Sequence, residues 1–503
     1  MLAAVAEGFA LFWNAEILLL CVIGVFVGLL LGVLPGLGGL TALALLLPFI
    51  YGMEPMAGLG FLLAAHAVVY TGGALTSIAL GIPGSGPNAA TVIDGYPMTR
   101  AGRGGVALGA AFAASGLGGI VGVIALVGLL PFLQPVVSHF GSPETFLFAV
   151  MGIIYVGVLG ERSMARGLIA GGLGVFLALF GYDRLAGVPR FWLGIDYLLD
   201  GIRLVPLVLG LFAIPEILAL GLGGTKAVHP DSRGDRFGQI LRGLRATVTR
   251  PYLLVKSSLI GVFIGIIPGV GGDTAPFVSY ASAKQTSATP EAYGSGCVEG
   301  VVAPEASNNA KEGGALVTTL ALGIPGSAGM SVLLGGFLLL GLEPGPDFLA
   351  NHMDLAVGLA IVLAFANLIA VVIMIAASPV LLRIAELRPQ VLAPILAVLL
   401  VLGAYAYQNQ PADVVATFVI GGLGCAMKYM GYSRPALVLG FVMAPLIETY
   451  LHISLQAYGM AFLLRPGALL LLGLIIMGLS WGRLRRFFLA AAARYGGNGD
   501  TKR

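Results

Sequence analysis

Charged side chains are scarce in this chain. Only 10% of its 503 residues are Asp, Glu, Lys or Arg and 58% are hydrophobic, whereas charged residues make up about 25% of an average soluble domain. Apolar runs such as Ile17–Val33, Gly105–Leu130 and Leu355–Ala377 approach or exceed the roughly 17 to 25 residues that cross the hydrocarbon of a bilayer. The shortage of charge therefore excludes a large soluble domain and predicts an all-α polytopic membrane protein.

Cysteine and histidine are also sparse. Cys21, Cys297 and Cys425 have no CxxC spacing, and the five histidines form no metal-ligand spacing. We therefore interpret the cysteines as packing residues and predict no metal centre and no cofactor. The GLGGLT segment lacks the third glycine of a dinucleotide-binding fingerprint, and GGDTA carries Val270 where the GxGD of intramembrane aspartyl proteases has its first glycine. A membrane-embedded enzyme is the weakest of the functions that the sequence leaves open.

Basic residues are missing before Arg100. The segment Lys226–Lys256 then carries seven of them against two acidic residues, and Arg483–Arg503 carries six against one. By the positive-inside rule, the middle segment and the C-terminus are predicted to be cytoplasmic and the N-terminus to lie outside. No basic n-region or small-residue cleavage site precedes the first apolar run, so we expect that run to be a retained membrane segment.

Three motifs occur twice, in the same order. GLLLGVLPGLGGLTA from Gly28 matches GVFIGIIPGVGGDTA from Gly261, and ALGIPGS occurs at both Ala79 and Ala321. LVLGLFAIPEI has a later counterpart in LVLGFVMAPLIE. The offsets are 233, 242 and 230 residues, so the order is kept while the spacing drifts, as expected after an internal duplication.

The charges of corresponding loops indicate that the two repeats are inverted. Arg100 and Arg103 follow the first GIPGS, whereas the matching segment of the second half holds acidic residues, Glu343, Asp347 and Asp354, and no basic residue. Four loop pairs exchange sides in this way, which is the pattern of inverted-topology repeats with an odd number of crossings each. One extra C-terminal helix then returns the tail to the cytoplasm.

This pattern gives the expected organisation of the chain. We predict roughly 11–13 membrane segments, with helices that are broken or re-entrant at the PGxGG and GIPGS motifs. The expected units are a first repeat at 1–222, a basic cytoplasmic linker at 223–256, a second repeat at 257–456, an extra membrane helix at 457–482 and a basic cytoplasmic tail at 483–503.

Four symmetric helix breaks form the candidate substrate site. A helix that restarts after glycine and proline points free backbone N–H groups, and the positive end of its dipole, at whatever precedes it. If the inverted halves face each other, four such tips would surround an anion, and a carboxylate is the substrate that we expect. The alternative is that the glycines only permit close helix packing. The tip residues predicted to bind substrate are Gly36, Gly38, Gly39, Thr41, Gly84, Ser85, Asn88, Gly271, Gly272, Thr274, Gly326 and Ser327.

Only the second half is charged near its breaks. Asp273 stands where the first half has a leucine. A helical APEASNNAKEGG would place Glu305, Asn309 and Glu312 on one face, where they would bind Na⁺ or exchange a proton. Lys311 would meet a substrate carboxylate or neutralise a glutamate, and the alternative is a solvated loop with ordinary surface charges. The residues predicted to hold the coupling ion are Asp273, Glu305, Ser307 and Asn309; both Na⁺ and H⁺ are open, and Na⁺ is favoured because neutral oxygens outnumber carboxylates.

The same motifs resemble those of a known family. PGLGGLTA, GIPGSGPNAATVIDGYPM and EGVVAPEASNNAKEGGALVTTLALGIPGS are similar to the large membrane subunit of tripartite tricarboxylate transporters, the TctA family, and the resemblance runs over nearly the whole chain. It implies a permease of the bacterial inner membrane that is driven by an ion gradient. It also implies two partners, a small membrane subunit of about four helices and a periplasmic solute-binding protein that delivers citrate-like or other carboxylates.

The resemblance further implies that the signature residues line the transport path. On that ground Asn308 and Asn309 join the predicted substrate-binding residues. The sequence thus predicts a secondary transporter of small organic carboxylates, with no nucleic-acid partner. A passive anion channel is the main alternative, and uptake that persists after the ion gradient collapses would favour it. The signature segments are Pro35–Thr41, Gly81–Asn88, Asp273 and Thr274, Glu305–Asn309 and Gly323–Ser327.

Overall fold

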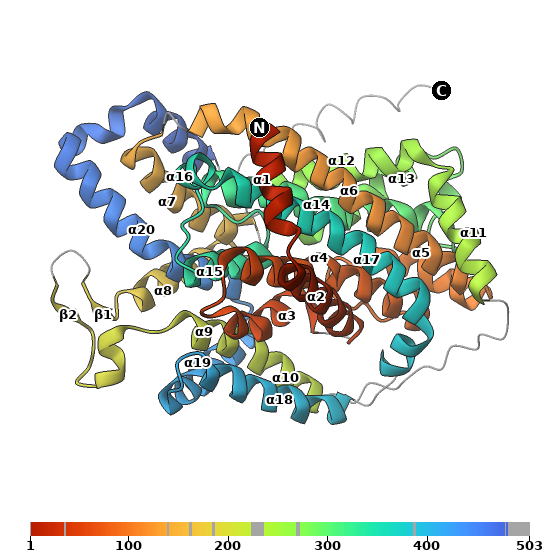
Figure 1. Ribbon diagram of the computed structural model, residues 1–503, viewed down its shortest axis with the longest axis horizontal. Coiled ribbons are helices and arrows are strands. Elements are labelled where there is room, and N and C mark those ends of the chain that lie inside the picture. The colour runs from red at the N-terminus through yellow and green to blue at the C-terminus, as the bar shows by residue number, and fades with distance from the viewer. Residues whose placement is uncertain are drawn as a thin grey trace, which may run out of the picture.

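The fold is built almost entirely from helices (Figure 1). The exception is a short antiparallel ladder, in which β1 (Gly181–Tyr182) pairs with β2 (Pro189–Arg190) at one edge of the molecule. The all-α fold predicted from composition is confirmed. The computed structural model describes residues 2–34, 37–137, 140–159, 163–183, 187–222, 236–267, 272–385, 389–477 and 479–480.

The first half contains most of the short helices as well as two long ones. Its helices are α1 (Leu2–Phe12), α2 (Ala15–Val33), α3 (Gly38–Leu46), η1 (Leu47–Ile50), α4 (Pro55–Leu80), α5 (Ala89–Arg100), α6 (Gly104–Val137), α7 (Ser142–Leu159), α8 (Met164–Ala178), η2 (Asp196–Asp200), α9 (Leu204–Val208), the π-helical turn η3 (Leu209–Ala213) and α10 (Ile214–Leu222).

The second half also combines short helices with a few long ones. Its helices are α11 (Arg236–Val248), α12 (Pro251–Ile266), η4 (Gly272–Thr274), α13 (Ala275–Gln285), η5 (Pro290–Ala292), α14 (Glu299–Leu322), α15 (Ala328–Leu339), α16 (Pro346–Asn351), α17 (Met353–Ala385), α18 (Pro389–Ala406), α19 (Pro411–Met430), α20 (Arg434–Tyr458), η6 (Gly459–Leu464) and a last helix at Pro466–Met477.

Several helices are suited to cross a membrane. Seven in the described ranges are long and apolar enough, and the number is eight if α11 and α12, which meet at 77°, are counted as one bent span. The polytopic membrane protein is therefore confirmed. Further apolar helices of 10–17 residues include Gly38–Ile50 and Ala328–Leu339, which begin at the predicted breaks. The predicted count of roughly 11–13 segments is reached only if such short helices also enter the membrane.

Two long helices, α4 and α14, occupy the centre of the molecule (Figure 1). Nearly every residue of both helices is buried. Each helix ends at a glycine with a left-handed backbone, Gly81 with a φ of 69° and Gly323 with a φ of 68°, and residues with a Cβ rarely adopt this conformation. The two ALGIPGS motifs thus produce the same helix end twice.

Glycines bring α2 directly onto α4, and α12 directly onto α14. A Cβ at Gly32 would collide with the carbonyl oxygen of Val69, and a Cβ at Gly265 would collide with that of Lys311. Small residues of this kind let helix backbones approach closely in membrane proteins. The two contacts are related by the same offsets as the repeated motifs, so both halves use one packing arrangement. The inverted orientation of the halves stays a prediction.

The two halves interleave. Helix α6 of the first half packs along α14, and α17 of the second half packs along α4, while α11 covers α6 and α1 covers α17. A Cβ at Gly118 of α6 would collide with the Ala306 carbonyl oxygen of α14. The polar helix α14 is therefore enclosed by helices of both halves, chiefly α6 of the first half and α12 of the second.

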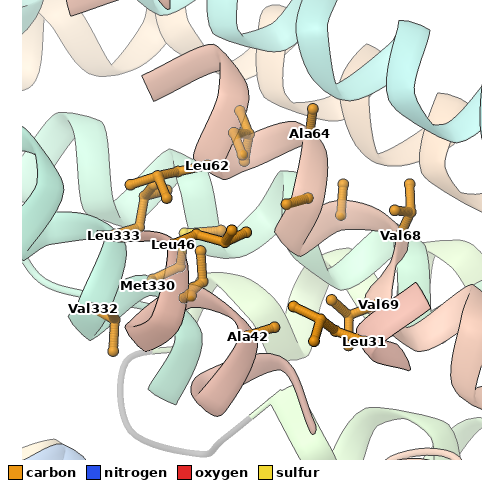
Figure 2. Close-up of a cluster of buried hydrophobic side chains, with 14 of the residues drawn as sticks. Leu31, Ala42, Leu46, Leu62, Ala64, Val68, Val69, Met330, Val332 and Leu333 are labelled. Atoms are coloured by element: carbon orange, nitrogen blue, oxygen red, sulfur yellow. The ribbon is translucent and has the colours of Figure 1, made fainter. Parts of the chain in front are cut away.

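An apolar core holds the helix breaks in place. Figure 2 shows Leu46 of α3, Leu62 of α4 and Leu333 of α15 lying close together, with Ala42 and Met330 beside them. These side chains are buried and belong to segments far apart in the sequence. Because packed cores deform little, this contact fixes where α3 and α15 begin relative to α4.

The predicted linker and C-terminal segment are partly helical. Residues 223–235 lie outside the described residues, but α11 follows them and is anchored where Thr247 Oγ1 donates to the Ala110 carbonyl at 3.1 Å. At the other end, the helix Pro466–Met477 packs on α7 through Leu471 and Phe148. The predicted tail at 483–503 lies outside the described residues.

Candidate substrate and ion site

Three of the predicted break segments line one cavity of about 320 Å³. The start of α3 contributes Leu37–Thr41, the loop after α4 contributes Pro83–Pro87, and the start of α15 contributes Ser327–Gly329. Segments from both halves of the chain therefore meet at this cavity. The remaining wall residues are Tyr70, Phe212, Glu216 and Arg434.

The cavity wall is rich in hydrogen-bond donors. Helices α3 and α15 both begin there, and the first N–H groups of a helix have no partner within the helix. Gly38, with a φ of 61°, turns the chain into α3, and Ser327 Oγ accepts a hydrogen bond from the Met330 N–H at 3.3 Å to start α15. Thr41 and Ser85 add hydroxyl groups. Such a wall suits an anion with several oxygens.

Arg434 adds a positive charge to the wall. Its Nη2 lies 3.2 Å from Glu216 Oε1, its Nη1 donates to the Leu211 carbonyl at 3.1 Å, and its guanidinium lies 5.5 Å from the centre of the Phe212 ring. Lys428 Nζ also contacts Glu216, at 2.6 Å from Oε2. Two cations thus share one carboxylate, which leaves an excess positive charge beside the cavity and favours an anionic ligand.

A cluster of buried charged groups lies behind the cavity. Glu312 of α14 lies 3.0 Å from Lys311 Nζ and 3.2 Å from His66 Nε2 of α4. Lys311 Nζ also lies 3.9 Å from the centre of the Tyr70 ring, and Tyr70 is part of the cavity wall. Buried charges are costly unless they are paired, and charged groups within the membrane are candidates for function.

Glu305 is bound by donors of the first half. Its Oε1 accepts hydrogen bonds from Thr91 and, at 3.4 Å, from Asn88 Nδ2, and its Oε2 accepts one from Ser115 at 2.8 Å. Asn88 Nδ2 also donates to the Tyr70 carbonyl, and its Oδ1 accepts from Ser85. Glu305 therefore joins α14 to α5 and α6, and Asn88 connects it to the cavity wall.

The other polar residues of α14 have different surroundings. Asn309 Nδ2 donates to Thr71 Oγ1 at 3.0 Å and to Asn367 Oδ1 at 2.7 Å. Ser307 Oγ and both polar atoms of the Asn308 side chain are buried without a hydrogen-bond partner among the described residues. The solvated-loop alternative is wrong, because α14 is helical and these residues are buried. Glu305, Asn309 and Glu312 share a helix face but contact three separate sets of partners.

The described residues of the second PGxGG break, Gly272–Thr274, do not line the cavity. Gly272 packs against Lys311, whose Nζ would lie 3.0 Å from a Cβ at that glycine, and Thr274 is exposed. Gly326 packs against Gly265 and Ala315. Gly36 and Gly271 lie outside the described residues, as does the side chain of Asp273, so their predicted roles stay predictions.

Several residues of this region were not predicted as site residues from the sequence, among them His66, Tyr70 and Arg434. The repeat offset of 242 residues contained a signal for two of them. It pairs His66 with Asn308 and Tyr70 with Glu312, so polar side chains occupy the same positions on both central helices. No comparable signal marks Arg434, whose place at the cavity follows from the packing of α20.

No cluster of three or more His, Cys, Asp or Glu side chains that would hold a metal ion occurs within the ranges that the structure describes. A Na⁺ ion at this site would therefore depend on neutral oxygens of amides, hydroxyls and backbone carbonyls, with at most two carboxylates. The asparagine and serine side chains of α14 supply such oxygens.

Comparisons with known proteins give a family and two relatives. The family described as "Tripartite tricarboxylate transporter TctA family" matches residues 18–439. An uncharacterised 52.8 kDa protein of Agrobacterium vitis, encoded 3′ of ttuC′ in TAR-I, is 32% identical over 461 residues, which cover 90% of each chain. A second uncharacterised protein of that organism, from TAR-II, is 33% identical over 217 residues, 42% of this chain and 90% of its own. No solved structure matches.

The family match spans most of the chain and includes all the break segments of the cavity. The chain therefore belongs to the tripartite tricarboxylate transporter TctA family, and it is a membrane component of a transporter and not an enzyme.

Proposed function

We propose that this chain is the transport subunit of an ion-gradient-driven importer of small organic carboxylates. The observation that carries the proposal is the cavity in which helix starts from both halves meet Arg434 and its excess positive charge. Backbone N–H groups and hydroxyls bind carboxylate oxygens without introducing a fixed countercharge. A cation at the wall then adds attraction for a substrate that carries more than one carboxylate.

The proposal includes the partners and the location of the subunit. A small membrane subunit and a periplasmic solute-binding protein would complete the transporter in the bacterial inner membrane, with the N-terminus periplasmic and the C-terminus cytoplasmic. Family membership supports this composition. The charge rule places Lys428 and Arg434 on the cytoplasmic side, so we infer that the cavity beside Arg434 faces the cytoplasm and that this conformation is inward-facing.

Arg434 provides the test of the substrate site. In proteoliposomes that contain all three components, Arg434→Gln is expected to weaken the apparent affinity for citrate about tenfold to hundredfold, because a charge-assisted hydrogen bond contributes about 1.5–3 kcal/mol. Arg166→Gln is the matched control. This substitution also removes one arginine charge close to Arg434. Arg166 donates a hydrogen bond to the Met430 carbonyl, but it is not part of the cavity wall.

The same vesicles separate a transporter from a passive channel. Citrate accumulation above equilibrium should vanish when ionophores collapse the ion gradient. An affinity unchanged by Arg434→Gln, while the variant folds normally, would place the substrate elsewhere. Equilibration of citrate at full rate without any gradient would favour the channel.

A further inference from the structure

His66 lies directly behind two glycines of the cavity wall. It is fully buried in α4, and a Cβ at Gly39 would come within 3.3 Å of its Nδ1, while a Cβ at Gly329 would collide with its ring. Both glycines line the cavity. Only the backbone of α3 and α15 therefore separates the imidazole from a ligand in the cavity.

The charged surroundings of His66 are close to balanced. The titratable groups that face it are Glu312 and Lys311 of α14 and Tyr70 of its own helix, whereas α3 and α15 bring glycines. Lys311 and Glu312 cancel each other when His66 is neutral. Protonation of His66 adds one uncompensated positive charge to this cluster.

Neither ring nitrogen of His66 has a hydrogen bond in the described part of the chain, and the contact of 3.2 Å with Glu312 does not have hydrogen-bond geometry. The imidazole is therefore not committed to one tautomer by a strong donor or acceptor. An imidazole can bind and release a proton at a ring nitrogen, which is why histidine serves as a proton carrier in proteins. It is suited to take up and release a proton in each transport cycle.

We propose that His66 is the proton-binding site that couples carboxylate entry to the proton gradient. A carboxylate in the cavity stabilises the added positive charge on His66, and the protonated imidazole stabilises the carboxylate, since charges interact strongly in a buried site. The coupling is reciprocal: the substrate increases proton affinity as much as the proton increases substrate affinity. Both would enter from the periplasm and leave together to the cytoplasm.

Glu305 has a structural role and does not bind the transported proton in this proposal. Its carboxylate already accepts three hydrogen bonds from Asn88, Thr91 and Ser115, so it holds α14 against α5 and α6. The proposed proton site, His66 of α4, instead faces Glu312, which lies about two turns further along α14. The driving ion is accordingly H⁺, in contrast to the Na⁺ that the number of neutral oxygens favoured.

The proposal rests on carboxylate transport by this chain, and the test separates the two. In proteoliposomes of the complete transporter, with the membrane potential clamped, an inward-directed gradient of about one pH unit should accumulate citrate about tenfold per proton. A Na⁺ gradient at constant pH should accumulate none. His66→Gln should lose the accumulation but retain exchange of internal for external citrate, while His452→Gln, which changes an exposed histidine of α20, should behave as the unmodified protein.

Two results would overturn the assignment of His66. They are accumulation that follows Na⁺ and ignores pH, and pH-driven accumulation that survives in His66→Gln. Absence of citrate exchange by the unmodified protein, tested alongside other di- and tricarboxylates, would instead refute the proposed transport function and with it this inference.

A measurement on the unmodified protein covers the case in which His66→Gln fails to fold. Titration calorimetry of citrate into the purified complex, in buffers of different ionisation enthalpy, should show uptake of about one proton per citrate. Binding without proton uptake contradicts the proposal.

Discussion

Asp94 connects the two halves through four hydrogen bonds. Its Oδ1 accepts from the backbone N–H groups of Gly294, Gly296 and Cys297 at 2.8–3.0 Å, and its Oδ2 accepts from the Tyr280 hydroxyl at 2.8 Å. The side chain is buried and belongs to the signature segment after the first GIPGS. Its contacts give this signature residue a structural role: it holds the loop before α14 against α5.

The reactivity of Cys297 reports on this connection. Burial, and secondarily the neighbouring Asp94 carboxylate, raise the pKa of the Cys297 thiol to about 12. Because the thiolate is the reactive form, we expect alkylation by iodoacetamide to be slow at pH 8 and to rise about tenfold per pH unit toward that value. Asp94→Asn should accelerate the reaction, since it removes a negative charge and loosens the loop. Mass spectrometry of the alkylated peptide gives the rate.

The exposed Asp196 of η2 supplies a control, because Asp196→Asn makes the same chemical change far from the thiol. Rapid alkylation of Cys297 at neutral pH in the unmodified protein would show that the loop is open and that Asp94 does not hold it closed.

The polar character of α14 could be predicted residue by residue, but its partners could not. Helical spacing places Glu305, Asn309 and Glu312 on one face, and the helix is present as expected. The spacing contains no information on which helices pass that face. His66 reaches Glu312 only because α4 and α14 lie together at the centre of the fold, and Arg434 reaches the cavity through the placement of α20.

Close helix packing at glycine is the main structural device at the level of elements. The sequence motifs showed where glycines cluster; Gly32 and Gly265, which precede the predicted tips, serve close helix packing, and so does the tip residue Gly326. Gly38 and Gly39 line the cavity, and Gly84 both lines the cavity and packs on Gly73. The two uses cannot be told apart from sequence, because both require the absence of a Cβ and only the neighbouring backbone decides between them.

Replacing a packing glycine should therefore separate α12 from α14. Gly265→Ala places a methyl group against the Lys311 carbonyl oxygen, which cannot move without displacing α14. Overpacking of this kind costs about 1–3 kcal/mol, and we expect a lower thermal unfolding temperature in detergent and a lower yield of folded protein. Gly32→Ala, at the equivalent contact on Val69, should have a similar effect.

Gly172 in α8 is the matched control, since a Cβ there would meet nothing within 4 Å. Gly172→Ala should leave stability unchanged or raise it slightly, because alanine favours helix over glycine. Equal stability of Gly265→Ala and Gly172→Ala would contradict the packing that places α12 on α14.

The molecule as a whole is less symmetric than its sequence repeats. The first PGxGG break opens into the cavity with both GIPGS segments, whereas Gly272 of the second break packs against Lys311. A transporter built from inverted repeats is expected to show such a difference in each of its two end states, because one half takes the arrangement that the other will adopt after the switch. The sequence repeats predict that the breaks can take two arrangements, but they do not predict which half has which arrangement in a given structure.

Labelling of single cysteines tests the inverted topology on which this interpretation depends. In a background without Cys21, Cys297 and Cys425, Ala101→Cys should react with a membrane-impermeant maleimide only after the membrane is opened, because Arg100 and Arg103 place it in the cytoplasm. Glu343→Cys, on the acidic counterpart loop, should react in intact spheroplasts. Both positions are exposed, whereas the neighbouring Gly345 is buried with a φ of 146° and would be strained by a side chain. Reaction of both cysteines from the same side would show that the halves are parallel, and no pseudo-two-fold axis in the membrane plane would then relate the two arrangements of the breaks.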